Sequence, residues 1–178
     1  MNYASKAKVY EKRPEGFSPR VEVAATYVKI NNRILFLELA NGKQEPGAWG
    51  VPAGKLEINE TPTKGAKREL FEETGIDVPS EHLFQPLGQL YIRKPDIDYI
   101  YHIFEVGLDL LPTIHLSNEH VAYEWVSLQE AEKLPLMNGA KEALNFYNAF
   151  SSKRPNRVQA SMDALEAIDE ENLYSESG

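Results

Sequence analysis

The chain has 178 residues, a formal net charge of −8 and no cysteine. Its length fits one domain with a sizeable core, and the lack of cysteine excludes disulfides and thiolate metal sites. No apolar run approaches the length of a membrane span, and the N-terminal residues lack the apolar stretch of a signal peptide. We therefore expect a cytoplasmic protein without a membrane partner.

The negative charge is concentrated at the C-terminal end. Residues 159–178 contain six acids and no lysine or arginine, which leaves 21 acids and 19 bases, or −2, in the rest of the chain. Without a basic stripe, a long nucleic acid is not an expected partner. We expect residues 1–157 to form one domain and residues 158–178 an acidic tail, helical or disordered. This tail is a candidate for docking a partner or a second subunit in a homodimer.

Taken in chain order, the hydrophobic pattern predicts a mixed α/β domain. Residues 20–30 and 33–39 read as strands joined by an Asn31-Asn32 turn. A polar loop over 41–47 precedes a short strand at 49–51, and a loop then leads into a helix. The remaining expected elements are strands at 84–92, 99–106 and 123–126 and helices at 128–133 and 139–150.

The helix after this loop has clear boundaries. Thr61 is a good N-cap, and Pro62 is favoured at the first helical position. Gly75 is expected to end the helix in a left-handed conformation. Between these ends, Ala66 and Leu70 lie one turn apart and predict a narrow buried stripe.

An acidic face on this helix predicts a metal site. Glu69, Glu72 and Glu73 fall together, away from the buried stripe. Glu69 and Glu73 are one turn apart, where like charges repel, so a divalent cation is their natural partner. Gly65 lies one turn before Glu69 and costs about 1 kcal/mol of helix propensity relative to alanine. We expect it to leave room for whatever lies against the acids.

The stretch from residue 54 to residue 76 resembles the Nudix box. That pattern is glycine, five residues, glutamate, seven residues, then Arg-Glu-aliphatic-x-Glu-Glu-x-Gly-aliphatic. Residues 47–53 also resemble the strand and loop that lead into the box, although Ala53 replaces a second glycine that many members carry. Every defined position of the pattern is filled, by Gly54, Glu60, Arg68, Glu69, Leu70, Glu72, Glu73, Gly75 and Ile76.

The resemblance implies the Nudix fold, an α/β fold with a mixed β-sheet sandwiched between α-helices. It also implies a hydrolase that cleaves a nucleoside diphosphate linked to another group, with Mg²⁺ or Mn²⁺ as cofactor. The implied metal ligands are Glu69, Glu72, Glu73, Glu119 and the carbonyl group of Ala53.

Other roles follow from the same resemblance. Arg68 is expected to pair with Glu60 or Glu72 and to orient the catalytic acids, and Gly54, Glu60 and Gly75 are expected to be structural. The general base remains open between Glu69 and Glu119, with His120 third.

The substrate is less well defined by the sequence. Lys55, Trp49 and Tyr91 are the substrate-binding candidates, and Tyr99 and Tyr101 are further aromatic candidates for stacking on a base. The leading expectation is a nucleoside or deoxynucleoside triphosphate, cleaved to the monophosphate and pyrophosphate. A diadenosine polyphosphate or nucleotide sugar is the alternative within the enzyme class. An alternative of another class is a catalytically weak nucleotide-binding regulatory module.

Overall fold

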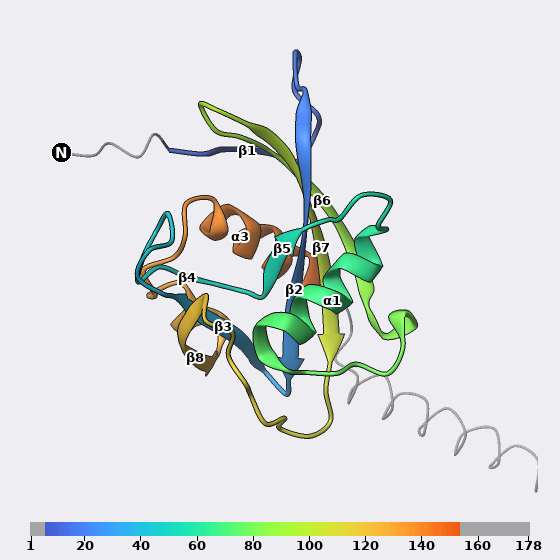
Figure 1. Cartoon of the computed structure of the whole chain (residues 1–178), viewed down its shortest axis with the longest axis vertical. Helices are drawn as coiled ribbons and strands as arrows, with labels where there is room; N and C mark the ends of the chain where they lie inside the picture. The colour runs from blue at the N-terminus through green and yellow to red at the C-terminus, as the bar shows by residue number, and fades with distance from the viewer. Residues whose placement is uncertain (1–5, 154–178) are drawn as a thin grey trace, which may run out of the picture. The chain divides into compact units, whose positions relative to one another are not determined.

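The structure is a computed structural model that describes residues 6–153 (Figure 1). Residues up to Tyr147 form one compact unit, and a second unit begins at Asn148, of which residues 148–153 are described. The boundary expected at residue 157 and the tail over 158–178 lie outside the described residues. None of the described helices is long and apolar enough to cross a bilayer.

The described strands and helices follow the predicted order with three additions, β1, β5 and a short 3₁₀ helix, η1. The bounds are β1 (Lys8–Tyr10), β2 (Pro19–Ile30), β3 (Arg33–Leu39), β4 (Trp49–Gly50), β5 (Ala53–Lys55), α1 (Pro62–Thr74), η1 (Glu81–Leu83), β6 (Gln85–Arg93), β7 (Asp98–Gly107), β8 (His120–Val126), α2 (Leu128–Ala131) and α3 (Ala140–Ser151).

The long strand β2 organises a mixed sheet with the strand order β1-β6-β7-β2-β3-β4. β2 and β7 run parallel, and the other pairs are antiparallel. β2 pairs with β3 only at Lys29 and Ile30, next to their turn, whereas β5 pairs with β2 at Val23, Ala24 and Ala25. Figure 1 shows β3 and β8 diverging from β2 beyond that turn. The divergence separates β3, β4 and β8 from β2, β5 and β7.

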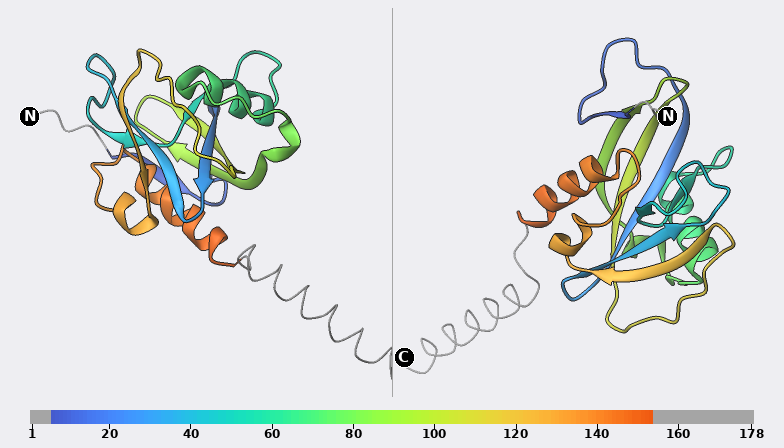
Figure 2. Two further views of the ribbon diagram at one scale, coloured as in Figure 1. Left: turned by 90° about the horizontal axis from the view of Figure 1, so that it is seen from below. Right: turned by 90° about the vertical axis from the view of Figure 1, so that its left-hand side faces the viewer.

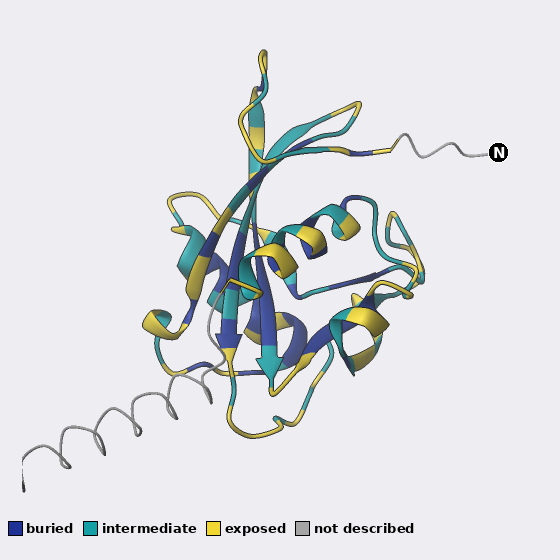
Figure 3. Ribbon diagram, turned by 180° about the vertical axis from the view of Figure 1, so that it is seen from behind, coloured by how far each residue is buried: buried dark blue, intermediate teal, exposed yellow. Residues whose placement is uncertain are grey.

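Opposite faces of the sheet pack against different helices (Figure 2). Val28 of β2 belongs to a buried cluster with Leu70 of α1. Tyr27 points to the other face, where its ring stacks on that of Tyr147 in α3 with centroids 4.1 Å apart. Figure 3 shows the resulting buried band along the middle of the sheet. The predicted mixed sheet between helices is confirmed.

Three parts of the sheet differ from the sequence prediction. β1 was not expected, β5 was expected to be a loop, and β8 begins at His120, three residues before the predicted position 123. β1 and β5 are each three residues long, too short to show an alternating hydrophobic pattern. Their strand character comes from pairing with β6 and β2, which only the tertiary fold provides.

Candidate active site

Helix α1 begins and ends as predicted. The Thr61 hydroxyl accepts from the Lys64 N–H at 3.4 Å, and Pro62 takes the first helical position. At the other end Gly75 has a φ of 72°, and its N–H donates to the Phe71 carbonyl at 2.8 Å. These caps set the two ends of the helix, and its buried residues Ala66 and Leu70 pack in the core cluster.

Strand β5 presents one backbone edge to α1. The Pro52 carbonyl and the Leu56 N–H bond to β2. Because bonded and non-bonded residues alternate along an antiparallel pair, the N–H and carbonyl of Ala53 point the other way. There the Ala53 N–H donates to Glu73 Oε2 at 3.0 Å. The φ of Ala53 is not positive, so alanine causes no backbone strain, and its carbonyl lies on the edge that faces the acids.

Arg68 holds several acids at once. Its Nε and Nη2 donate to the two Glu60 oxygens at 2.9 and 2.8 Å, while its Nη1 donates to Glu69 at 2.7 Å and Glu72 at 3.0 Å. The Arg68 hydrogen bond is the main cause that lowers the pKa of Glu60. The same contact raises the pKa of the guanidinium further above its usual range. Arg68 is thus a permanent cation that orients Glu69 and Glu72, and it contacts both of its expected partners.

Two glycines of the motif allow close approaches to α1. A Cβ built on Gly54 would overlap the carboxyl group of Glu69, so glycine lets that carboxyl group lie against β5. A Cβ on Gly65 would overlap Leu56 and lie 3.1 Å from Glu60 Oε2. The expectation that Gly65 leaves room beside the acids is therefore corrected, because Leu56 and Glu60 fill that space.

The acidic face of α1 opens into a cavity of about 820 Å³. Residues from both sides of the divergence between β2 and β3 line it. Its charged and aromatic lining includes Glu69, Glu72, Glu73, Glu119, Lys43, Lys55, Lys94, Tyr27, Tyr99 and Tyr101.

Glu73 is the most buried of these acids, with 7% of its surface exposed. Burial raises its pKa to about 8; the Ala53 N–H opposes this shift, and the charges of Glu69 and Glu119 add to it. Burial also raises the pKa of Glu69. The ionised forms of Glu69 and Glu73 therefore lack water and are repelled by neighbouring carboxylates, an environment that a cation relieves.

Glu119 immediately precedes β8 and His120 is its first residue, and both reach the cavity. The Ser117 N–H donates to the Glu73 carbonyl at 3.2 Å and so ties the segment before β8 to α1. Glu119 Oε1 lies 2.7 Å from Lys43 Nζ. His120 Nε2 lies 4.0 Å from Glu73 Oε1, and burial lowers the pKa of the imidazole. The structure thus brings the predicted distant acid to the same cavity as the helix acids.

Two of the predicted substrate-binding residues do not line the cavity. Trp49 is 8% exposed and packs in the core. Tyr91 packs edge-on against Phe17 with ring centroids 5.3 Å apart, and its hydroxyl accepts from Gln89. Only Lys55 of the three lines the cavity.

The cavity also contains loop residues that the sequence analysis did not select. Lys94 Nζ lies 3.9 Å from Glu45 Oε1 and 5.9 Å from the centre of the Tyr99 ring. The Asn138 N–H donates to Glu45 Oε2 at 2.7 Å. Lys43, Glu45, Lys94 and Asn138 come from three separate connections. The sequence indicates only that these residues lie in connections between predicted strands and helices; it does not show that the connections meet at the motif.

The donor set fits a hard divalent cation. Carboxylates and a backbone carbonyl are the ligands that Mg²⁺ and Mn²⁺ prefer. As the side chains are oriented, no three acidic or histidine residues among 6–153 are grouped as a metal site. Glu69 and Glu72 bond to Arg68, and Glu119 bonds to Lys43. If these carboxylates bound a metal ion, they would have to turn from their cationic partners, whereas Glu73 and Ala53 already face one another.

Comparison with known proteins places this site in a family. The NUDIX domain profile matches residues 19–149. The phosphatase NudJ of Shigella boydii is 31% identical over 118 residues, which cover 66% of this chain and 74% of that protein. The MutT protein of Methanosarcina mazei has a TM-score of 0.63 and 26% identity, over 76% of this chain and 97% of that one.

A further fold neighbour carries a metal ion and a nucleotide. The bifunctional NMN adenylyltransferase/ADP ribose pyrophosphatase of Francisella tularensis, complexed with AMP and a Mn ion, has a TM-score of 0.59. It is 22% identical over 73% of this chain and 41% of that one.

The chain belongs to the Nudix family, as a Nudix-type nucleotide pyrophosphohydrolase. Hydrolases of this family generally depend on a divalent metal ion. The predicted fold and enzyme class are therefore confirmed.

Proposed function

We propose that the chain hydrolyses a nucleoside or deoxynucleoside triphosphate to the monophosphate and pyrophosphate, with Mg²⁺ or Mn²⁺ held by Glu69, Glu72, Glu73, Glu119 and the Ala53 carbonyl. The observation that carries the proposal is the convergence of these groups on one cavity of about 820 Å³. A cavity of this size accommodates a nucleotide.

The cavity lining has two kinds of residue. Glu69, Glu72 and Glu73 come from α1 and Lys55 from β5, whereas Tyr99 of β7, Ile97 and Met137 add an aromatic and apolar surface. An apolar and aromatic surface suits a base, and the acidic side suits a metal-bound phosphate chain. This arrangement supports Tyr99, in place of Trp49 and Tyr91, as the candidate for stacking on the substrate.

The bound metal ion would neutralise the phosphate oxygens and activate the attacking water. Before a metal ion binds, Arg68 keeps Glu69 and Glu72 on the cavity side of the helix through its hydrogen bonds at 2.7 and 3.0 Å. Glu69 and Glu119 remain the two candidates for accepting the proton of water, since both line the cavity. His120 is a weaker candidate, because only 7% of its side chain is exposed.

Names of similar proteins widen the substrates to be tested. The 31% identical relative is called a phosphatase, which makes inorganic phosphate a product to measure beside pyrophosphate. A Caenorhabditis elegans Ap4A hydrolase shares the fold at 20% identity and a TM-score of 0.60. Diadenosine polyphosphates therefore belong in the same panel, together with nucleotide sugars.

The test is a hydrolysis screen of the full chain with each substrate class in Mg²⁺ and in Mn²⁺. Phosphate and pyrophosphate are measured separately, and Glu73→Gln is the matched control. We expect triphosphates to give pyrophosphate at a rate far above that of the control. A preference for another class would replace the proposed substrate, and equal rates for both proteins on every substrate would support the regulatory module instead.

A further inference from the structure

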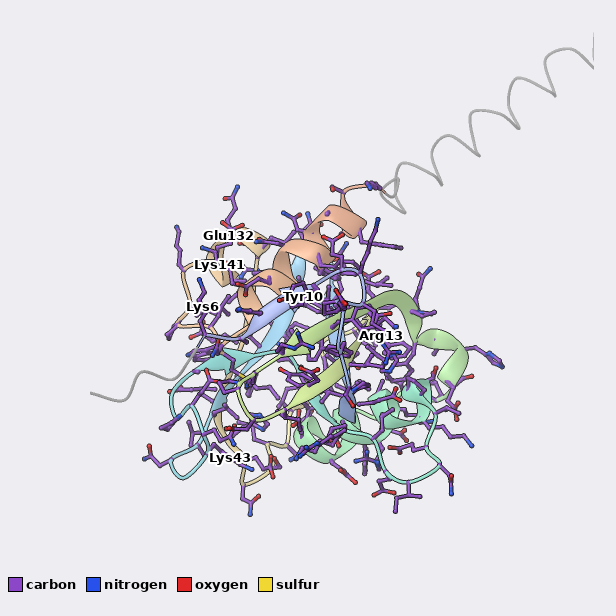
Figure 4. All side chains as sticks on the ribbon, turned by 90° about the horizontal axis from the view of Figure 1, so that it is seen from above. Lys6, Tyr10, Arg13, Lys43, Glu132 and Lys141 are labelled. Atoms are coloured by element: carbon purple, nitrogen blue, oxygen red, sulfur yellow. The ribbon has the colours of Figure 1, made fainter. Side chains whose placement is uncertain are left out.

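Lys43 lies in the loop between β3 and β4, where it is labelled in Figure 4. The loop is anchored beside Glu119, because the Ala40 N–H donates to the Glu119 carbonyl at 2.9 Å and the Lys43 N–H donates to the Ala40 carbonyl at 3.4 Å. The base of the Lys43 side chain is therefore held at a fixed place relative to Glu119.

The ammonium group of Lys43 forms an ion pair with Glu119, one of the carboxylates proposed to bind the metal ion. Lys43 Nζ lies 2.7 Å from Glu119 Oε1, and both residues line the cavity. Burial raises the pKa of Glu73, and the positive charge of Lys43 partly opposes this shift. Lys94, another lysine of the cavity, instead lies 3.9 Å from Glu45 near the ring of Tyr99.

We propose that Lys43 holds Glu119 until a divalent cation takes that carboxylate, and that the released ammonium group then binds a phosphate oxygen of the substrate. A divalent cation and an ammonium group on one carboxylate repel each other, so metal binding at Glu119 weakens the Lys43 contact and favours its release. A lysine is a compact charge on a flexible stem, and charge-assisted hydrogen bonds to phosphate are among the strong ones.

The consequence is a coupling between metal binding and phosphate binding. Before the metal ion binds, Lys43 pairs with the Glu119 carboxylate. After the metal ion binds, the Lys43 ammonium group is free to bind phosphate, so it does so only in a cavity that already holds the metal ion. The Lys43 and Glu119 side chains are 36% and 50% exposed, so the pair is partly solvated. Its rupture is therefore a small cost that a divalent ion readily overcomes. Lys43 is thus a residue that positions a ligand first and contacts substrate second.

The test measures Mn²⁺ binding to the full chain without substrate, by the electron paramagnetic resonance signal of free Mn²⁺. Lys43→Met removes the competing charge and keeps a similar stem, and Lys94→Met is the matched control because it removes the same charge from the same cavity. We expect Lys43→Met to tighten Mn²⁺ binding by about two- to fivefold, the size typical of a partly exposed ion pair. Lys94→Met should leave the affinity unchanged.

A second measurement addresses the phosphate contact. Pyrophosphate binding is followed by calorimetry with Mn²⁺ in constant excess, and we expect Lys43→Met to weaken it by roughly tenfold. Unchanged or weaker Mn²⁺ binding in Lys43→Met would overturn the proposal that Lys43 and the metal ion compete for Glu119. Tighter Mn²⁺ binding with unchanged pyrophosphate binding would overturn the phosphate contact.

The inference depends on the proposed role of Glu119 as a metal ligand, so Glu119→Gln is included. Weaker Mn²⁺ binding in Glu119→Gln, with no change in Lys43→Met, would contradict the Lys43 inference and leave the proposed site intact. Unchanged Mn²⁺ binding in Glu119→Gln would instead show that Glu119 is not a ligand and would overturn both.

Discussion

At the scale of the residue, Glu73 is the acid whose charge depends most on its surroundings. It is nearly inaccessible to water, and it accepts a hydrogen bond from the Ala53 N–H at 3.0 Å. Glutamine also offers an oxygen to that N–H but never ionises. Replacing Glu73 by glutamine therefore separates the effect of charge from the effect of packing.

We predict that Glu73→Gln loses most hydrolytic activity and stabilises the metal-free fold in a pH-dependent manner. The pKa of Glu73 rises from 4.5 to about 8 on folding, so the folded state binds an extra proton between these values. Wild-type stability should fall as pH rises through this window. The advantage of Glu73→Gln should be near zero below pH 4.5 and should reach at least about 1 kcal/mol by pH 8.

Urea unfolding in chelator at several pH values measures this difference. Glu72→Gln is the control, because it removes the same charge from the same helix face at a side chain that is 54% exposed. A stability gain in Glu73→Gln that is independent of pH would contradict the account of Glu73 as a buried, protonated acid.

Gly54 provides a second test of the site's geometry. We predict that Gly54→Ala remains folded but loses most activity, because the added methyl group would displace the Glu69 carboxyl group, which is the flexible end of its side chain. Gly107→Ala is the control, since a Cβ there meets nothing within 4 Å. Circular dichroism and steady-state kinetics decide between the outcomes. Normal turnover in Gly54→Ala would show that Glu69 need not lie against β5.

The sequence identified cavity-lining residues outside the spaced motif as well as within it. The helix acids come from the motif, whereas Glu119, Lys55, Tyr99 and Tyr101 lie outside its defined positions, and all of them line one cavity. Trp49 and Tyr91 were selected as aromatic residues that could stack on a base, but residue type does not reveal which face of a strand is buried. Both pack against other residues instead.

At the scale of the element, Arg68 joins α1 to the loop that precedes it. Its two hydrogen bonds to Glu60 are paired, and the side chains of Arg68 and Glu60 are 22% and 11% exposed. We predict that Arg68→Ala lowers the free energy of unfolding by roughly 2 kcal/mol, the scale of hydrogen bonds to a charged group, and also lowers activity.

Denaturant unfolding of Arg68→Ala and Arg33→Ala makes the comparison. Arg33 and Glu130 are 56% and 50% exposed, so the loss of that pair should cost little. Equal stability changes in the two variants would contradict a structural role for Arg68.

Elements with their own local signals were predictable. The caps of α1 are Thr61 and Gly75 as expected, and the strands β2 and β3 match their predicted ranges to within a residue. The strands β1 and β5 were not predicted, because three residues carry too little pattern. The Ala53 carbonyl was expected at the site, but the strand β5 and the hydrogen bond from the Ala53 N–H to Glu73 were visible only in the fold.

At the scale of the whole molecule, the cavity is lined by residues from Val21 to Ala140. We predict that truncation after Arg157 leaves turnover within a few-fold of that of the full chain, because the removed residues follow all of the lining residues. Light scattering on the same protein tests whether the acidic tail supports the proposed homodimer. A folded truncated protein with activity as low as that of Glu73→Gln would mean that the tail completes the site.

The sequence could not predict which loops line the cavity, because these loops are far apart in the chain. Its wall includes loops near residues 43, 94 and 138, and the divergence of β2 from β3 brings them around the motif. Such contacts depend on strand pairing over long distances in the chain, which no local pattern specifies.

The central claim is that the carboxylates of this cavity perform metal-dependent hydrolysis of a pyrophosphate bond. The most direct measurement is hydrolysis of a nucleoside triphosphate by the full chain in excess chelator, followed by titration with Mg²⁺ or Mn²⁺. We predict that activity disappears in chelator and returns with the added ion in the wild-type protein, while Glu73→Gln stays nearly inactive throughout. Hydrolysis that continues unchanged in excess chelator would contradict the claim.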